Sequence, residues 1–354
     1  MFIGRLAVGG GEKVLAMMAN HLIQEGWDVD IVTLLGDEVE RAHFSLSSQI
    51  RIIDIHPVGH KPYSRNVLHW LRRIRQVVHE RRPDVIISFF GRINALVLTA
   101  TIGKNIPTVV SERNDPKRDG RGKLMQKYCD CIYRRASAIV FQTNYEQSCF
   151  SPVHANKSHV IHNPVEMLDV NNNPIDKNLI VAVGRLEEQK NHLMLIEAME
   201  IVRKRLPEVK CEIYGSGTLH DAFQRYVNKH GLHDCVVFEG KRSDVLNCIS
   251  KARAFVMTSN FEGLSNALME AMMLGKICIS TDYDGIEDLI TDGENGVIVP
   301  RNDVGRLADV LTDIIQDREG KYDEMGKNAR KRISAFESTI ILNQWNKLLE
   351  SVLE

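Results

Sequence analysis

Two glutamates, Glu262 and Glu270, are separated by seven residues in the segment SNFEGLSNALMEA. Glu262 precedes a helix expected to start near Leu264, and Glu270 lies about two turns into it, roughly 9 Å along the axis. The two carboxylates could bind hydroxyls at opposite ends of a long polar ligand, with the helix N-terminus beside a phosphate between them. This pattern favours a nucleotide sugar, and a glycosidase pair flanking one bond is the alternative.

Two cations lie close together in the segment GRLEEQKN. Arg185 ends an apolar strand and Lys190 opens the next helix. Each charge-assisted hydrogen bond from such groups to a phosphate contributes about 1.5 to 3 kcal/mol, so the pair could neutralise a pyrophosphate without a metal. Because this pair would supply the positive charge that a metal otherwise provides, we expect activity without a divalent ion. Solvated surface charges are the alternative reading of the segment by itself.

Glycine turns follow several predicted strands. The run Gly9–Gly11 precedes a helix, where backbone amides can approach an anion closely. Two further segments, YGSGTL at 214–219 and FEGKR at 238–242, follow later strands. Neither GxGxxG nor GxxxxGK[ST] occurs, which disfavours a nicotinamide or P-loop site. Tight turns without a ligand are the alternative for each segment.

The composition indicates an enzyme of two domains. A chain of 354 residues exceeds what one core usually holds, and 44% hydrophobic with 26% charged residues is ordinary for a globular protein. No apolar run approaches the ~20 residues of a spanning helix. Seven cysteines without a CxxC pair favour neither a zinc site nor a disulfide framework. The N-terminus carries no export signal, and we expect a cytoplasmic protein.

Short apolar runs alternate with amphipathic stretches along the chain, which predicts βα repeats and parallel sheets. We expect a domain over 1–165, a linker over 165–177, a second domain over 175–335 and a helix over 338–353 that packs elsewhere. Ligands of such sheets lie at the carboxyl ends of the strands, so the active site is expected between the domains. The predicted strands are 28–35, 51–55, 84–89, 108–111, 138–142, 159–162, 179–183, 210–214, 236–239, 254–258, 277–280 and 297–299. Helices are predicted over 12–24 and 67–78, the latter with an apolar stripe at Val67, Leu71, Ile74 and Val78.

These motifs, in this order, resemble the retaining glycosyltransferase family 4. The likeness runs from GGGEKVLAMMANHLIQEGWDVDIVT through VIHNPV to GRLEEQK, YGSGTL and FEGLSNALMEAMMLGK, and its most specific feature is the EX7E spacing of Glu262 and Glu270. It implies the GT-B architecture: two doubly wound Rossmann-like α/β domains facing across a cleft. The N-terminal domain would bind the acceptor, the second domain the nucleotide sugar, and residues 336–354 would pack back on the first.

The resemblance also implies roles for individual residues. Arg185 and Lys190 would bind the donor diphosphate, Glu262 the donor sugar and Glu270 the ribose. The remaining donor-binding set is Gly10, Gly11, Gly184, Gly215, Lys241, Arg242, Gly263, Leu264, Ser265 and Asn266. The first strand is shorter than is usual in the family. The segment SERNDP stands where many members carry a histidine, and we expect its Glu112, Arg113 and Asn114 to shape the acceptor or donor pocket.

The expected reaction is metal-independent, retaining transfer of a hexose or N-acetylhexosamine from a nucleotide sugar, with UDP as the expected nucleotide, to a glycan or polyprenyl-linked acceptor. Alternatives are an epimerase or phosphorylase of the same architecture and a non-catalytic sugar-nucleotide-binding subunit.

Residues 1–165 hold 22 Lys+Arg against 15 Asp+Glu, which predicts docking on the anionic inner face of a membrane and no nucleic-acid partner. The basic residues of this surface are Arg65, His69, Arg72, Arg73, Arg75, Arg82, Lys117, Arg118, Arg121, Lys123 and Lys127. A merely solvated charged face is the alternative.

Overall fold

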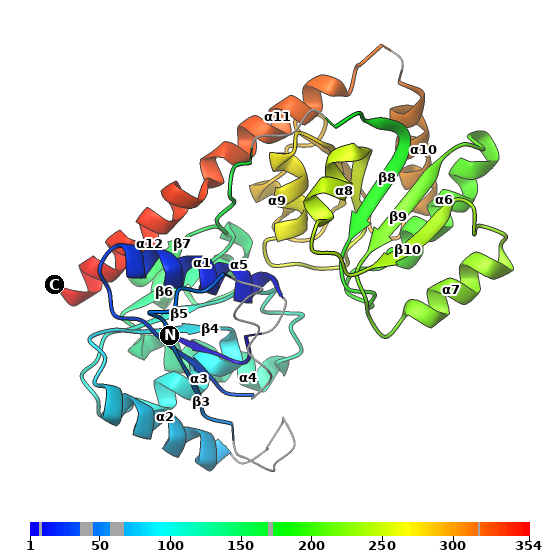
Figure 1. Ribbon diagram of the computed structural model, residues 1–354. Helices are drawn as coiled ribbons and strands as arrows, with labels where there is room; N and C mark the ends of the chain where they lie inside the picture. Colours follow the sequence, from blue (N-terminus) through cyan, green and yellow to red (C-terminus); the bar gives the residue numbers. More distant parts are fainter. Residues whose placement is uncertain (7–8, 36–44, 57–66, 169–172, 318) are drawn as a thin grey trace. The chain divides into compact units, whose positions relative to one another are not determined.

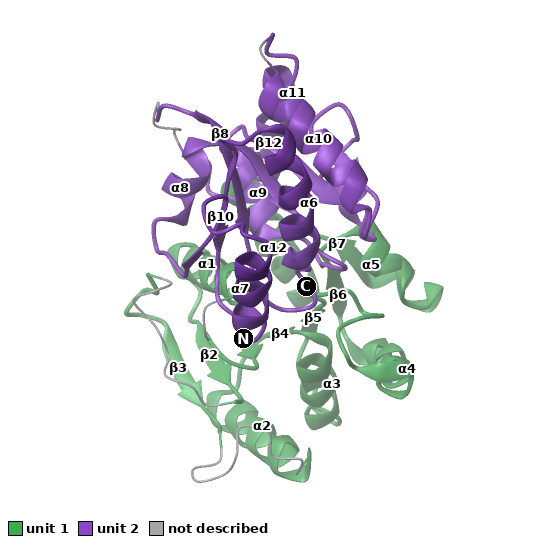
Figure 2. Cartoon of the chain, turned by 90° about the vertical axis from the view of Figure 1, so that its right-hand side faces the viewer, with its two compact units in different colours: residues 1–164, 338–354 green, residues 165–337 purple. Residues whose placement is uncertain are grey.

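The computed structural model describes residues 1–6, 9–35, 45–56, 67–168, 173–317 and 319–354. They form two compact units (Figure 2). Unit 1 comprises Met1–Pro164 and Ser338–Glu354, and unit 2 comprises Val165–Glu337. The C-terminal helix thus belongs with the N-terminal residues of the chain rather than with the unit that precedes it.

Unit 1 is built on a parallel sheet of seven described strands in the order β3-β2-β1-β4-β5-β6-β7 (Figure 1). Apolar residues fill its inner strands, and β4, β5 and β6 are buried along their whole lengths. Strand β1 is two residues long, as the short first segment predicts. The strands are β1 Phe2–Ile3, β2 Asp30–Thr33, β3 Arg51–Asp54, β4 Ile86–Phe89, β5 Thr108–Ser111, β6 Ala138–Phe141 and β7 Ser158–Val160.

Helices cover both faces of this sheet (Figure 1). Helices α2, α3 and α4 lie on one face, and α1 packs against α12 on the other. The apolar stripe of α2 differs from the prediction, because Trp70, Ile74, Val77 and Val78 are buried whereas Val67 is 54% exposed. The helices are α1 Gly10–Gln24, α2 Val67–Arg81, α3 Gly91–Ala100, α4 Gly122–Ile132, α5 Asn144–Ser148 and α12 Ser338–Leu353, with short 3-10 turns at Tyr133–Arg135 and Pro152–Lys157.

Unit 2 repeats the architecture with six described strands in the order β10-β9-β8-β11-β12-β13. Helix α6 packs on α10, and α8, α9 and α11 cover the other face (Figure 1). Strand β8 begins earlier than predicted, which shortens the linker. The strands are β8 Asp176–Val183, β9 Lys210–Tyr214, β10 Val236–Gly240, β11 Ala252–Met257, β12 Ile277–Thr281 and β13 Val297–Val299. The helices are α6 His192–Arg205, α7 His220–Lys229, α8 Val245–Lys251, α9 Asn266–Met273, α10 Val304–Gln316 and α11 Asp323–Ile333, with 3-10 turns at Ile286–Asp288 and Ser334–Phe336.

Each sheet has one point at which the strand order reverses direction. In unit 1 this topological switch point lies between β1 and β4, and in unit 2 between β8 and β11. The connections that leave these neighbouring strands run to opposite faces of the sheet, which opens a crevice at the carboxyl ends of the strands. The loops after β1, β4, β8 and β11 therefore hold the candidate ligand-binding positions.

Polar and aromatic contacts hold helix α12 against the rest of unit 1. The Trp27 indole donates a hydrogen bond to Asn346 Oδ1 at 3.0 Å. The Arg113 guanidinium lies 4.5 Å from the Phe89 ring centroid and 5.4 Å from that of Trp345, and it donates to Asn163 Oδ1 at 2.9 Å. Burial lowers the pKa of Arg113 to about 10, so the side chain remains charged at neutral pH. Arg113 thus joins the end of β4 to the C-terminal helix.

A buried ion pair holds the carboxyl end of β5. Glu112 is fully buried and accepts two hydrogen bonds from the Arg121 guanidinium, at 3.0 and 2.5 Å, and a third from the Tyr133 hydroxyl. Burial raises the pKa of the Tyr133 phenol well above its usual value, which keeps it a donor. A side chain at Gly91 would collide with the guanidinium, so this glycine is the space that admits Arg121.

Loss of this ion pair is expected to destabilise unit 1 strongly. Arg121→Met should lower the free energy of unfolding by about 3 to 5 kcal/mol, because it leaves a buried carboxylate without its cation. Arg118→Met, which removes a half-exposed arginine 3.8 Å from Asp115, should cost less than about 1 kcal/mol. Urea denaturation of the full chain measures both. The double variant Arg121→Met/Glu112→Leu should be more stable than Arg121→Met, and equal losses in the two single variants would contradict the assignment.

Candidate functional site

Two glycines set the shape of the loop that follows β8. The Gly184 amide donates to the Tyr214 carbonyl at 2.9 Å, which brings the ends of β8 and β9 together. Gly215 has a φ of 142°, and a Cβ there would overlap the Gly184 carbonyl. Only glycine fits this position. The YGSGTL segment therefore has a structural function at Gly215, where the absence of a side chain allows the backbone to approach the Gly184 carbonyl closely.

The loops after β8 and β11 are bonded to each other across the switch point. The Asn260 side chain and backbone amide donate to the Glu188 and Gln189 carbonyls, both at 2.8 Å. The Gln189 side chain donates to the Phe261 carbonyl at 3.0 Å, and the Thr258 hydroxyl donates to the Lys190 carbonyl at 3.1 Å. Sequence reasoning missed Thr258 and Asn260, because an uncharged side chain that bonds backbone carbonyls carries no pattern.

Lys190 and Glu262 form an ion pair at this junction. Lys190 Nζ lies 2.6 Å from Glu262 Oε1, and only 13% and 9% of the two side chains are exposed. The charges are thus held at fixed positions and partly shielded from water. Arg185, by contrast, is exposed, and it donates to Gln189 Oε1 at 3.0 Å. The structure therefore brings the predicted cations to one loop and places the first glutamate of the EX7E pair directly against one of them.

Helix α9 positions the second glutamate. The Ser265 side chain accepts from the Leu268 amide at 3.5 Å and caps the helix, which begins at Asn266. The predicted start near Leu264 was therefore two residues early, because Ser265 and not Leu264 provides the cap. Glu270, which is partly exposed, lies little more than one turn into the helix rather than two. Gly263 and Leu264 are buried in the connecting loop.

Lys241 and Arg242 lie apart from the ion pair. They follow β10, which is separated from β8 by β9, so about 10 Å of sheet lies between the strands. Arg242 donates twice to Asp244, at 2.8 Å for each bond, and this partner neutralises its charge. Lys241 is exposed. The structure thus leaves Lys241 as the available cation of this segment.

Two buried residues that sequence reasoning missed lie next to the ion pair. His192 is 3% exposed, and burial together with the charge of Lys190 lowers its pKa to about 4. Tyr283 is fully buried, and burial together with the charge of Glu262 raises its pKa well above the usual value. Both groups are consequently neutral at pH 7. Each thus adds a neutral side chain within electrostatic range of one member of the pair.

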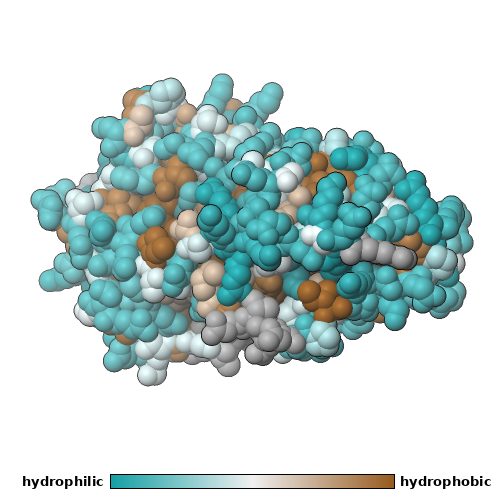
Figure 3. All heavy atoms as spheres, turned by 90° about the horizontal axis from the view of Figure 1, so that it is seen from above, coloured by the Kyte–Doolittle hydropathy of each residue, from teal (hydrophilic) through white to brown (hydrophobic). Residues whose placement is uncertain are grey.

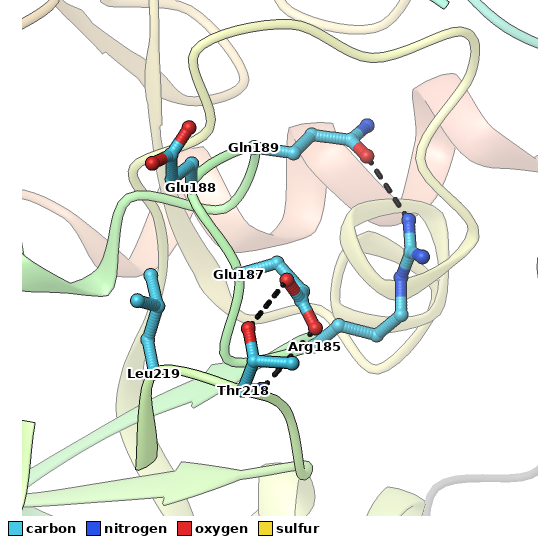
Figure 4. Close-up of a pocket in the computed structure, with 6 residues that line it drawn as sticks. All are labelled: Arg185, Glu187, Glu188, Gln189, Thr218 and Leu219. Carbon is cyan, nitrogen blue, oxygen red and sulfur yellow. Dashed lines mark hydrogen bonds between the residues drawn. The ribbon is translucent and has the colours of Figure 1, made fainter. Parts of the chain in front are cut away.

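A surface hollow of about 360 Å³ lies beside Arg185, which is one of the residues that line it (Figure 4). The Glu187 carboxylate accepts from the Thr218 amide at 3.2 Å and from its hydroxyl at 3.0 Å, which ties the loop after β8 to that after β9. The lining residues are Arg185, Glu187, Glu188, Gln189, Thr218 and Leu219. The hollow is large enough to admit one part of a small polar ligand beside the Arg185 guanidinium.

The unit 1 candidates divide into two groups. Gly10 and Gly11 are the first two residues of helix α1, which the sequence predicted to begin near Glu12, and this helix follows β1 at the switch point. Glu112 and Arg113, expected to shape a ligand pocket, instead direct their side chains into the interior, where Arg121 and the α12 helix engage them. Asn114 accepts from the Asp115 amide at 3.0 Å. The charged residues of the SERNDP segment predicted a ligand pocket. Charged side chains can, however, also be held inside a fold by buried ion pairs.

Two family models match the chain in succession. The model described as Glycosyltransferase Family 4 matches residues 8–167, and that described as Glycosyl transferases group 1 matches residues 166–332. Their boundary at 166–167 falls at the division between the two units. Together they account for both sheets.

Relatives of similar length point the same way. The chain is 27% identical, over 99% of its length and 97% of the relative's, to a Campylobacter jejuni protein named as GalNAc-α-(1->4)-GalNAc-α-(1->3)-diNAcBac-PP-undecaprenol α-1,4-N-acetyl-D-galactosaminyltransferase. Among solved structures, Anabaena HepE in complex with UDP and glucose matches with a TM-score of 0.84 at 18% identity, over 99% of this chain and 98% of that one. Staphylococcus aureus TarM, in complex with UDP and other ligands, matches with a TM-score of 0.81 at 15% identity, over 98% of both chains.

The matched models, the full-length relatives and the two Rossmann-like sheets agree on one classification. The chain is a glycosyltransferase of the GT-B fold, in which a part that matches Glycosyltransferase Family 4 is followed by a part that matches Glycosyl transferases group 1.

Proposed function

We propose that this protein transfers a hexose or N-acetylhexosamine from a UDP-sugar to a glycan or lipid-linked acceptor in cell-surface polysaccharide synthesis, with retention of anomeric configuration. The observation that carries the donor assignment is the Lys190–Glu262 pair at the switch point of unit 2, with Arg185 exposed on the same loop. The acceptor class is supported by the undecaprenol-linked substrate in the name of the Campylobacter jejuni relative.

The donor would be held by groups of opposite charge at fixed positions. Lys190 and Arg185 supply two positive charges for the diphosphate, and Glu262 accepts hydrogen bonds from hydroxyls of the donor sugar. Glu270 binds the ribose. Because Lys190 already lies against Glu262, its ammonium can bond a phosphate oxygen and the carboxylate together, which links recognition of the sugar to that of the leaving group.

In the transfer step, the bond between the anomeric carbon and the phosphate oxygen breaks while the acceptor oxygen attacks the same face of the sugar. The acceptor proton passes to a phosphate oxygen of the departing diphosphate. Lys190 and Arg185 stabilise the charge that develops there, and this electrostatic contribution is usually the largest in such reactions. Glu262 is not assigned as a nucleophile, since its carboxylate is paired with Lys190.

Substitutions at the two motif positions should have different kinetic effects. Lys190→Met should lower kcat by roughly 10- to 1,000-fold, because the leaving group loses a positive charge in the transition state. Glu270→Gln should mainly raise the donor KM, because a ribose contact is present in both ground and transition states. Initial rates against donor concentration test both. Lys229→Met, at an exposed lysine of the same unit, should match wild type in both kinetic parameters. The melting temperature of each variant shows whether it is folded at the assay temperature.

Activity should not require a divalent metal, because Arg185 and Lys190 provide the positive charge. No cluster of three His, Cys, Asp or Glu side chains suited to a metal occurs among the described residues. Transfer should keep its rate after exhaustive treatment with EDTA. Loss of activity that Mg²⁺ or Mn²⁺ restores on titration would refute the metal-independent mechanism.

Two rival functions make different predictions. An epimerase or phosphorylase would consume the nucleotide sugar without a glycan acceptor, and a non-catalytic subunit would bind it without turnover over a panel of acceptors. Product analysis by NMR, with the anomeric configuration of donor and product compared, separates these outcomes from retaining transfer.

We further propose that unit 1 docks on an anionic membrane through helix α4. Leu124 is 86% exposed on α4 and Tyr128 is 43% exposed, and they lie next to the exposed Lys123 and near Lys127. Basic residues near anionic lipid contribute about 1 kcal/mol each. On the face drawn in Figure 3, hydrophobic residues form separate small patches within a hydrophilic surface. None of the described helices is long and apolar enough to span a bilayer.

Several residues of the predicted basic surface are engaged within the fold or lie outside the described residues. Arg121 is excluded because it is buried against Glu112, and Arg75 donates to the Ala100 and Ile102 carbonyls. Arg65 lies outside the described residues. The exposed basic residues that remain lie in two places: Arg72 and Arg82 at α2, and Lys117, Arg118, Lys123 and Lys127 on α4 and the segment before it. We choose α4 because it and that segment carry more of these charges.

Docking through α4 should depend on its lysines and on salt. Lys123→Glu/Lys127→Glu should reduce co-sedimentation with vesicles containing 30% anionic lipid on the order of tenfold or more, since each reversal replaces attraction by repulsion. Lys229→Glu/Lys251→Glu in unit 2 makes the same change of charge and should bind as wild type does. Equal binding of wild type to neutral and anionic vesicles would oppose membrane docking and favour a soluble acceptor.

A further inference from the structure

The switch point of unit 1 carries a different chemistry from that of unit 2. The strands that flank it are β1 and β4; Gly9 precedes helix α1, which follows β1, and Phe90 directly follows β4. As in unit 2, residues of the two loops meet across the crevice. Here, however, the contact is made by the Phe90 ring, whose Cζ lies 2.5 Å from the position that a Cβ of Gly11 would occupy. An aromatic ring thus stands where unit 2 has a lysine and a glutamate.

The backbone at Phe90 is strained. Its φ is 72° and its ψ 131°, a combination that a bulky L-residue rarely adopts. Hydrogen bonds hold it there, since its amide donates to the Ser111 carbonyl at 3.0 Å and its carbonyl accepts from the Asn94 amide at 2.8 Å. Glycine would adopt this conformation at no steric cost, yet the chain carries phenylalanine. Strain of this kind persists mainly where the geometry serves a function.

The arginines beside the backbone of Phe90–Arg92 are engaged by other groups. Arg121, which lies against Gly91, is paired with Glu112 in the interior. Arg92 follows in the same loop but directs its guanidinium to the Gly120 carbonyl at 2.6 Å. Phe90 itself is partly exposed. A flat apolar surface beside glycine backbone suits the C–H face of a pyranose ring better than it suits a phosphate.

We propose that Phe90 is a specificity-determining residue that binds the terminal sugar of the acceptor by stacking, with the missing side chain of Gly11 providing room for the ring. This inference rests on the proposed function, because only a transferase has an acceptor for Phe90 to bind. The strained backbone of Phe90 fixes the ring at the crevice, and the energetic cost of that strain disfavours a purely structural role for the residue.

Three variants separate stacking from packing. Phe90→Leu keeps apolar volume but removes the flat ring, and should raise the acceptor KM about tenfold while the donor KM stays within twofold. Phe90→Tyr keeps the ring and should remain within twofold of wild type in both. Phe90→Gly removes ring and strain together, so its acceptor KM should rise although its melting temperature is not lowered. An equal rise in donor and acceptor KM, or no change in Phe90→Leu, would overturn the proposal.

A binding experiment gives a result even if no transfer is found. Saturation-transfer NMR with methyl α-glycosides of glucose, galactose, N-acetylglucosamine and N-acetylgalactosamine should show at least one of them bound through its ring C–H protons. That signal should vanish in Phe90→Leu and persist in Phe90→Tyr. Absence of turnover with every UDP-sugar, in a protein that retains the signal, would refute the proposed function alone. Absence of the signal in wild type, or an unchanged signal in Phe90→Leu, would refute the assignment of Phe90 alone.

Discussion

The pair between Lys190 and Glu262 is the interaction on which the proposed donor site of unit 2 depends. It joins the loop after β8 to the loop after β11, at the single place where neighbouring strands send their connections to opposite faces of the sheet. A lysine and a glutamate in bulk water attract each other only weakly. Here the pair is largely buried, and hydrogen bonds from the Asn260 and Thr258 side chains to backbone carbonyls join the two loops.

Glycine is needed wherever this arrangement requires backbone to approach other groups closely. Gly215 allows the end of β9 to approach the Gly184 carbonyl, Gly91 leaves space for a buried guanidinium, and Gly11 leaves space for an aromatic ring. In each case a methyl group would displace a residue that carries charge, hydrogen bonds or a ring. These glycines therefore contribute the space that a side chain would otherwise fill, as well as backbone conformations that other residues rarely adopt.

The two units have the same topology but different chemistry at equivalent positions. Parallel strands with one reversal of order produce a crevice in each sheet, and the fold does not specify what occupies it. In unit 2 the crevice is bridged by charge, which suits a diphosphate and the hydroxyls of a sugar. In unit 1 it is bordered by an aromatic ring and glycine backbone, and the nearby arginines are engaged elsewhere. A glycosyltransferase needs a site for each of two unlike substrates, and this difference is consistent with that division.

The sequence by itself determined the α/β class, the two successive units and the strands to within a few residues, because alternating apolar runs and amphipathic helices are local patterns. It also provided the candidate residues Arg185, Lys190, Glu262 and Glu270, because their types and spacing form a pattern that can be recognised without a fold. Tertiary structure alone decided that Glu112 and Arg113 are interior residues, since burial depends on partners such as Arg121 and Trp345 that are distant in sequence. It alone placed His192, Tyr283 and Phe90 at the crevices, because an uncharged or aromatic side chain acquires a role there only from the groups that the fold brings against it.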